Sequence, residues 1–344
     1  MSRLSEARAS GRCYVIAEAG SNHNGDWSLA EQLIAVAAGA GADAVKFQAF
    51  RAERLYPRGA GAAAYLEDSE DIYDIVARME LPDSWLPELA AETRKHDIDL
   101  LISAFDELSA EAVDPFVPAH KLASYELTHE PLLRRLAAFG KPLLVSTGAA
   151  TLTEIASAVD AARDAGAHDL TLLQCTAAYP ARLEAMNVSS IAELGAQFGV
   201  AAGLSDHSED PTIAPVLAIG YGASVIEKHF TLDRDLPGPD HRFALDPEGL
   251  GAMVVAIRGA EAARGSGSKA VHADEQELRT FARRSVFAIR DIEEDEIFDP
   301  ASIAVLRDGT LGQGLPPARY PSLLSRRAAR RIAANTPLQE SDVK

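Results

Sequence analysis

Short apolar segments alternate with amphipathic segments along most of this 344-residue chain. Between residues 13 and 265, β-branched or apolar runs of strand length recur, and each is followed by a more polar stretch. These runs are Cys13–Ala17, Ala42–Phe47, Leu100–Ser103, His120–Ser124, Pro142–Ser146, Leu170–Gln174, Val200–Gly203 and Ser224–Glu227.

Stretches rich in Ala and Leu, with helical periodicity, lie between the runs. They include Ser28–Ala40, Pro82–His96, Pro131–Phe139, Thr151–Ala165 and Val188–Phe198. Pro82 is expected to open its helix, and Asp83 and Thr153 are expected to act as caps. Eight strand–helix units favour a (β/α)8 TIM barrel over an open doubly wound sheet, with seven or nine strands as alternative counts.

Polar side chains follow every predicted strand. Turn chemistry explains such residues at single strand ends, but not a series of eight ends that supply Lys, His, Glu and Ser. Barrel enzymes place their chemistry at the carboxyl ends of the strands, so we expect one shared site there. The candidates are Glu18, Ser21, Asn22, His23, Lys46, Gln48, Ser103, Lys121, Ser124, Glu126, Ser146, Thr147, Gly148, Gln174, Thr176, Tyr179, Ser205, Asp206, His207, Glu227, Lys228 and His229.

A Gly-Ser-Gly-Ser break follows Arg264, and from Phe281 the pattern changes to short strands and turns, with strands expected at Val286–Ile289 and Ile303–Leu306. The charge changes at the same place. Residues 281–344 hold ten Lys and Arg against nine Asp and Glu, a net charge of +1. Since the whole chain has a net charge of −18, residues 1–280 carry −19. We therefore expect a barrel over residues 1–265, a linker over 266–280 and a small domain over 281–344.

Composition excludes several classes of function. The net charge of −18 and a pI near 4.9 argue against nucleic acid and anionic membranes as partners. No apolar run approaches the ~20 residues that span a bilayer, and the polar start lacks a secretory signal. Cys13 and Cys175 are expected to be buried free thiols, which is typical of a reducing compartment. A cytoplasmic protein is the resulting expectation.

Two histidines at neighbouring strand ends are candidate metal ligands. His207 closes the run GLSDH and His229 closes VIEKHF, so both side chains are expected at one mouth of the barrel. Imidazole binds divalent Mn, Zn or Fe, and such an ion acts as a Lewis acid on a carbonyl. A structural or capping role is the alternative for each histidine.

Lys46 and Lys121 are candidate anion ligands, because an ammonium group at the end of an apolar strand must be solvated or paired. The turn at residues 146–148 and Ser205 add donors that can cradle a phosphate. The alternative is a salt bridge across the barrel mouth. Glu18 and Glu126 are candidate acid–base or hydroxyl-binding groups, or partners of the two lysines.

One further carboxylate, Asp240, lies in the loop LPGPDHR, where Pro-Gly-Pro holds a rigid turn, so turn capping is its alternative role.

These motifs, taken together, resemble the sialic acid synthase family, which includes N-acetylneuraminate, legionaminate and pseudaminate synthases. The resemblance rests on an ordered set that covers nearly the whole chain, and the last residues resemble the family's antifreeze-like (SAF) domain. The segments are IAEAGSNHNG (16–25), GADAVKFQ (41–48), HKLASYE (120–126), GKPLLVSTG (140–148), LLQCTAAYPA (172–181), GLSDHS (203–208), ASVIEKHFTLDRDLPGPDH (223–241) and RRSVFAIRDI (283–292).

The resemblance implies an enzyme that condenses phosphoenolpyruvate with an N-acetylmannosamine-like aldose beside a divalent metal, Mn²⁺ or Mg²⁺. His207 and His229 would hold the metal. Glu126, Glu18 and Asp240 would be catalytic or face the open-chain sugar, with Tyr179. The family also swaps its small domain between the subunits of a homodimer, so Arg307, with Phe281 nearby, would reach the partner's acceptor. The residues around phosphoenolpyruvate would be Lys46, Ser103, Lys121, Ser124, Ser146, Thr147, Gly148 and Ser205.

Three departures from the family pattern leave the acceptor open. Ala177 stands where relatives commonly have Asn or Ser, and Asp308 replaces proline in the triplet after the last strand. KLASYE is closer to pseudaminate types, whereas PGPDH is closer to neuraminate and legionaminate types. The alternatives are a synthase for a deoxy diacetamido sugar, a Schiff-base aldolase with Lys46 or Lys121 as nucleophile, and a non-catalytic sugar-binding relative.

Overall fold

Eight parallel strands close into a barrel in the first of two units, Met1–Ser266 and Gly267–Lys344. This computed structural model describes residues 3–62 and 70–344. Each strand pairs with its sequence neighbours, and β1 also pairs with β8, which confirms the predicted TIM barrel. The strands are β1 (Tyr14–Gly20), β2 (Ala44–Ala49), β3 (Asp99–Ala104), β4 (His120–Leu122), β5 (Leu143–Ser146), β6 (Leu170–Cys175), β7 (Ala201–Asp206) and β8 (Val225–His229).

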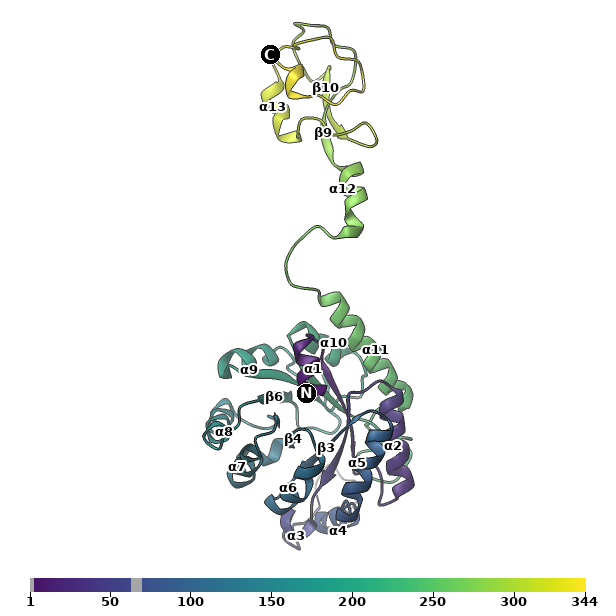
Figure 1. Ribbon diagram of the computed structural model, residues 1–344, viewed down its shortest axis with the longest axis vertical. Coiled ribbons are helices and arrows are strands. Elements are labelled where there is room, and N and C mark those ends of the chain that lie inside the picture. The colour runs from purple at the N-terminus through teal and green to yellow at the C-terminus, as the bar shows by residue number, and fades with distance from the viewer. Residues whose placement is uncertain (1–2, 63–69) are drawn as a thin grey trace. The chain divides into compact units, whose positions relative to one another are not determined.

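Helices surround the strands, as Figure 1 shows for α2, α5, α6, α7 and α8. Apolar side chains from the outer face of the strands pack against the inner faces of these helices and form the main core. Two short helices, α3 (Ala52–Leu55) and α4 (Ile72–Arg78), are inserted between β2 and β3. The others are α2 (Trp27–Gly39), α5 (Leu86–Lys95), α6 (Glu107–Val113), α7 (Glu130–Ala138), α8 (Leu152–Asp164), α9 (Ser190–Phe198), α10 (Ile213–Gly220) and α11 (Pro247–Arg264).

The expected helix starts were wrong at two places. Helix α5 begins at Leu86, after a 3-10 turn that contains Asp83, and Pro87 occupies its first turn. Pro82 therefore lies outside the helix. Helix α8 is capped by Thr151, whose side chain accepts from the Glu154 backbone while the Glu154 carboxylate accepts from Thr151. This reciprocal pair satisfies two free amide donors, which Thr153 inside the helix cannot do.

Side-chain alternation divides each strand between the barrel interior and the surrounding core. Tyr14 and Ile16 of β1 point inward at the amino-terminal end and join an apolar cluster with Ala44, Leu101 and Val225. Leu4 and Ala7 of α1 (Arg3–Ala9) pack into the same cluster, so this short helix covers that end of the barrel. The apolar layer leaves the carboxyl ends of the strands for polar groups.

The second unit has its own small core. It contains α12 (Gln276–Ala282), the antiparallel pair β9 (Arg284–Ala288) and β10 (Ile303–Arg307), and α13 (Tyr320–Leu323). Buried side chains that include Val286, Phe298 and Ile332 pack between them. Both strands predicted here are present, and β9 begins two residues earlier than expected. Part of segment 266–280 is helical, because α12 begins at Gln276.

Cys13 and Cys175 are buried free thiols, as predicted. Within the described residues, no helix combines the length and the hydropathy that crossing a bilayer requires.

Close packing at Gly203 of β7 gives a test of the barrel. A Cβ at this position would lie 2.2 Å from the Val225 carbonyl oxygen and 2.8 Å from a Leu173 methyl group. Because a strand backbone cannot easily move away, we expect Gly203→Ala to lower the free energy of unfolding by about 2–3 kcal/mol. The measurement is denaturant unfolding.

The matched control is Gly259→Ala in helix α11, where an added Cβ meets no atom within 4 Å among the described residues. Alanine is the better helix former, so this variant should gain about 0.5–1 kcal/mol. Equal stabilities for the two variants would contradict the packing described here.

Candidate active site

Four charged side chains are buried together at the carboxyl end of the barrel. Lys46 Nζ lies 2.8 Å from Glu18 Oε2 and donates to Ser103 Oγ at 2.9 Å. Glu227 links the two lysines, at 3.8 Å from Lys46 and 3.4 Å from Lys121. Inward-facing positions of β1, β2, β4 and β8 supply these residues, so the alternation of the strands itself brings them together. We call Glu18, Lys46, Lys121 and Glu227 the charged cluster.

Burial and pairing act in opposite directions within the charged cluster. Burial raises the pKa of Glu18 to about 6, although Lys46 opposes the shift. Burial would also raise the pKa of Glu227, but Lys121 and Lys46 together hold it below its ordinary value. Burial would lower the pKa of Lys46, yet Glu18 and Glu227 raise it. For Lys121 burial prevails and the pKa falls. Glu18 is therefore the member that changes protonation most readily near neutral pH.

Two imidazole rings lie beside the charged cluster, with centroids 5.4 Å apart. His207 Nδ1 is 3.0 Å from the carbonyl oxygen of Thr176, which only accepts, so Nδ1 carries the proton and Nε2 keeps a free lone pair. Burial, with the positive charges around it, holds the pKa of His229 well below its ordinary value. Burial would lower the pKa of His207 too, but its contacts with Cys175 and the Thr176 carbonyl raise that pKa above its ordinary value. His229 is therefore the ring that is held in the neutral form, which is the form that binds a metal.

These two histidines fit a metal site with open positions. Among the residues that the structure describes, no His, Cys, Asp or Glu cluster of three or more forms an all-protein cage. Within that same set, His229 Nδ1 is a buried nitrogen without a hydrogen-bond partner, and Asp240 Oδ2 lies 3.5 Å from it. Two neighbouring imidazoles suit a divalent ion that completes its shell with water or substrate.

Carboxylates converge on Gly20 at the end of β1. Its φ is +55°, and a Cβ there would come within 3.3 Å of Asp240 Oδ2 and 3.5 Å of Glu18 Oε1. Gln48 donates to the same Glu18 oxygen at 2.7 Å. Burial raises the pKa of Asp240 to about 6. Glycine here leaves room for three polar groups that face one another.

The opposite side of the mouth carries hydroxyl and backbone donors. Ser124 Oγ accepts from the Gly148 amide at 3.0 Å, and a Cβ at Gly148 would lie 2.8 Å from that oxygen. Ser146 Oγ is buried and has no hydrogen-bond partner within the described part of the chain, so it is free to meet a ligand. Thr147 instead donates its hydroxyl to the Leu173 carbonyl at 2.9 Å. Ser205 donates to Glu227 at 3.2 Å.

Aromatic and acidic groups complete this mouth. The ring of Tyr179 stacks on His207, with centroids 4.3 Å apart. Glu126, in a 3-10 turn after β4, is 9% exposed, and burial raises its pKa to about 7.

Comparison with known proteins identifies the family. A family model described as the NeuB family matches residues 33–269. This chain belongs to the NeuB family. A model of the SAF domain matches residues 283–344, which confirms the antifreeze-like domain predicted for the carboxyl-terminal region.

Relatives that align with most of this NeuB-family chain carry several different names. It is 41% identical to the spore coat polysaccharide biosynthesis protein SpsE of Bacillus subtilis, over 96% of this chain and 93% of that protein. It is 36% identical to the N,N'-diacetyllegionaminic acid synthase of Legionella pneumophila, over 95% and 93%. The crystal structure of N-acetylneuraminic acid synthetase from Leptospira borgpetersenii superposes with a TM-score of 0.71 at 30% identity, covering 78% and 90% of the chains.

The two remaining predicted residues of this NeuB-family chain lie in its second unit, Phe281 in α12 and Arg307 in β10. Phe281 is half exposed, and its carbonyl accepts from the Gly309 amide at 2.9 Å. Arg307 ends β10 opposite Arg284. The contact of Arg307 with the acceptor in a partner subunit stays a prediction.

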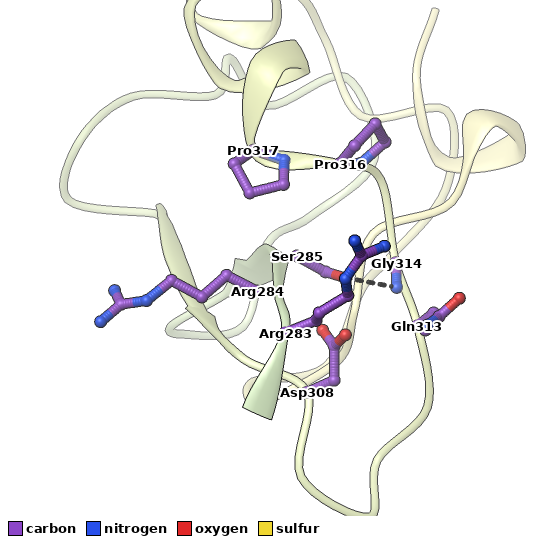
Figure 2. A pocket seen from close by; sticks show the side chains of 8 residues that line it. All are labelled: Arg283, Arg284, Ser285, Asp308, Gln313, Gly314, Pro316 and Pro317. Atoms are coloured by element: carbon purple, nitrogen blue, oxygen red, sulfur yellow. Dashed lines mark hydrogen bonds between the residues drawn. The ribbon is translucent and has the colours of Figure 1, made fainter. Parts of the chain in front are cut away.

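Asp308, which replaces proline, makes a backbone hydrogen bond that proline cannot make. Its amide donates to the Arg283 carbonyl at 2.8 Å. The side chain is buried and lines a cavity of about 310 Å³ within the SAF domain, together with Arg283, Ser285 and Gln313 (Figure 2). The loop is therefore held by the main chain instead of by a proline ring.

Glu227 is the site residue that the sequence pattern did not single out for a role. It was noted at a strand end beside His229, but its contacts with Lys121 and Ser205 cross from β8 to β4 and β7. Period-two alternation offered a signal, because Glu227 and His229 share the inward face while Lys228 points outward to Asp206 at 2.6 Å.

The raised pKa of Glu126 predicts a pH-dependent stability. The folded chain holds this proton up to about pH 7, whereas the unfolded chain loses it near 4.5. The free energy of unfolding therefore falls as the pH rises through that window. Glu126→Gln removes the effect, so it should match the wild type below 4.5 and exceed it by up to about 3 kcal/mol near pH 8. Denaturant unfolding at both pH values measures this.

Glu88→Gln, on the exposed side of α5, is the matched control. It should change the free energy of unfolding by the same amount at both pH values. A pH-independent difference between Glu126→Gln and the wild type would contradict a buried protonated carboxyl group at this position.

Proposed function

We propose that this chain condenses phosphoenolpyruvate with an aminosugar aldehyde to give a sialic-acid-type nine-carbon sugar acid. The observation that carries the proposal is the placement of two neighbouring histidines beside two buried lysines at the carboxyl end of the strands of a TIM barrel. The named activities of the family relatives, a legionaminic acid synthase and an N-acetylneuraminic acid synthetase, support the same reaction class.

The lysine side of the site suits the phosphate and carboxylate of phosphoenolpyruvate. Lys46 and Lys121 supply buried cationic groups, and charge-assisted hydrogen bonds from such groups are among the stronger polar contacts. The buried hydroxyl of Ser146, which has no hydrogen-bond partner within the described residues, adds a donor, whereas the Gly148 amide already donates to Ser124. Ser103, Ser124 and Ser205 already bond to members of this set, which fixes its geometry before a ligand arrives. Thr147 orients the turn instead of contacting the ligand.

The histidine side suits a divalent ion, Mn²⁺ or Mg²⁺. His207 and His229 would hold it, with Asp240 close to His229. When bound, the ion supplies Lewis-acid polarisation of the aldehyde carbonyl and positive charge near the phosphate.

The reaction forms one carbon–carbon bond and exchanges the carbon–oxygen bond to phosphate for a carbon–oxygen bond to water. The enol carbon of phosphoenolpyruvate attacks the aldehyde carbon with the electron pair of its double bond, and the aldehyde oxygen takes up a proton. Water then adds to the resulting oxocarbenium carbon and loses a proton. The bond from that carbon to the phosphate oxygen then breaks while the new hydroxyl group gives up its proton to the leaving phosphate, which leaves the keto acid and inorganic phosphate.

Two carboxyl groups of raised pKa are suited to these proton transfers. Glu126 has a pKa of about 7 and Glu18 a pKa of about 6, both near the pH at which a shared proton moves in either direction. Asp240 and Tyr179 face the sugar side beside the histidines and are proposed to orient the hydroxyl groups of the open-chain aldose.

One observation favours a second candidate. Burial lowers the pKa of Lys121, and an amine of lowered pKa is suited to Schiff-base formation. An aldolase of that kind would keep its activity in a chelator and would be trapped by borohydride with pyruvate. Glu227 at 3.4 Å favours the charged ammonium form instead, which supports the anion-binding role.

The decisive assay follows inorganic phosphate. We expect Mn²⁺-dependent release from phosphoenolpyruvate only when an acylamino aldose is present, together with a nine-carbon keto acid of matching mass. Chelator should abolish the release. Turnover that persists in chelator, with borohydride trapping, would overturn the condensation in favour of the aldolase.

The metal assignment has its own test in His229→Ala. Loss of one of two imidazole ligands should weaken Mn²⁺ binding by at least about tenfold, because disturbing even the support of a metal ligand costs 10–100-fold. Calorimetry with Mn²⁺ alone reads this directly, and turnover should fall in parallel. His168→Ala, at an exposed histidine, is the matched control. Unchanged Mn²⁺ affinity in folded His229→Ala would refute the assignment.

A further inference from the structure

The cavity of about 310 Å³ in the SAF domain has the size of a small-molecule site. The rings of Pro316 and Pro317 form one side of it, and Arg283 and Asp308 lie on the facing side (Figure 2). The cavity therefore has one apolar wall and one charged wall.

Hydrogen bonds and close packing hold these walls in place. Ser285 Oγ accepts from the Gly314 amide at 2.9 Å, and the Gln339 side chain donates to the Gln313 carbonyl at 2.9 Å. A Cβ at Gly314 would lie 2.9 Å from the Leu338 carbonyl oxygen, so the main chain packs tightly here. Walls that are ordered beforehand spare a ligand the cost of ordering them.

Asp308 brings an unsatisfied acceptor to the charged wall. Its side chain is 2% exposed, and Oδ1 has no hydrogen-bond partner among the described residues. Buried polar groups are normally hydrogen-bonded, and a buried carboxylate oxygen without a donor is costly. A ligand that donates an O–H or N–H group to this oxygen would remove that cost.

Arg283 gives the same wall a group that binds anions. It is exposed, forms no ion pair within the part of the chain that the structure describes, and extends across the cavity toward Gly314 (Figure 2). Arg284 points away from the cavity and donates to the Val305 carbonyl at 3.1 Å. A guanidinium group binds carboxylate or phosphate through paired hydrogen bonds. Arg283 therefore favours an anion in this cavity and opposes a cation beside Asp308.

The ligand has to meet the whole charged wall at once. A simple anion brings no donor for Asp308, and a neutral polyol leaves Arg283 without an opposite charge. A sugar with an acidic group brings hydroxyl donors for Asp308 and an anion for Arg283, and its C–H faces can cover the two proline rings.

We propose that this cavity binds a hydroxylated organic anion of sugar size, a sugar acid or a sugar phosphate. A hydroxyl group of the ligand donates to Asp308, and the acidic group meets Arg283. The inference does not rest on the proposed function, because all the residues that line the cavity belong to the second unit.

Calorimetry on the full chain with three sugars that differ only at C6 tests the ligand class. Glucose carries a hydroxyl group there, glucuronate a carboxylate and glucose 6-phosphate a phosphate. One of the two anions should bind at least about tenfold more tightly than glucose, because hydrogen bonds between charged groups are the stronger kind, and the tighter anion identifies the source. Acetate, which has the charge without the hydroxyl groups, should also bind at least about tenfold more weakly than that anion. Failure of both anions to bind, or equal binding of the three sugars, would overturn the proposal.

Two substitutions then test the location of the bound anion. Arg283→Gln should weaken its binding by about tenfold or more. Asp308→Asn replaces a charge-assisted hydrogen bond by a neutral one, so a loss of about tenfold is expected, and the fold should persist because a buried charge is removed. Arg290→Gln is the matched control, since this exposed arginine pairs with Glu296 instead, and it should bind the anion like the wild type. Wild-type affinity in Arg283→Gln or in Asp308→Asn would place the ligand elsewhere and overturn the assignment.

Discussion

The charged cluster of Glu18, Lys46, Lys121 and Glu227 is the constraint on which the rest of the site depends. Its members are almost fully buried, and each charge is tolerated because an opposite charge lies within 3.8 Å. Two cations and two anions balance, so the cluster has little positive charge to spare for a multiply charged anion. Proton uptake by Glu18 supplies one further positive charge, and a divalent ion at the histidines would supply two. A metal ion at the histidines would therefore add the positive charge that the lysine side lacks for binding a multiply charged anion.

Strand alternation explains how one short segment serves both function and stability. In VIEKH, Glu227 and His229 face the barrel interior, while Lys228 faces outward and binds Asp206 and the Ser208 carbonyl, both at 2.6 Å. The outward pair is buried between β7, β8 and the loop that follows, where it ties the two strands that carry His207 and His229. A change at Lys228 would therefore disturb the histidines without touching a ligand, and this separates positioning from chemistry along a single strand.

The sequence predicted the barrel because buried parallel strands have two apolar faces and read as continuous runs. The same runs placed Lys46, Lys121, His207 and His229 at their ends, and the structure brings these four residues to one mouth. Boundaries were less predictable, because the start of α5 depends on a 3-10 turn and that of α8 on a reciprocal cap. The role of Glu227 depends on contacts between strands distant in sequence. The hydrophobic cluster of α3 and α4 with Phe50 and Phe105 depends on contacts that periodicity does not report.

The site thus divides into two parts with different origins. Strand positions supply the charged cluster and the histidines, and their geometry is fixed by the barrel itself. The insertion that contains α4 supplies an apolar wall beside Asp240 through Ile72 and Val76, and insertions of this kind tolerate sequence change that strands do not. A change in the insertion would reshape this wall while the charged cluster and the histidines stay in place, because strand positions hold them.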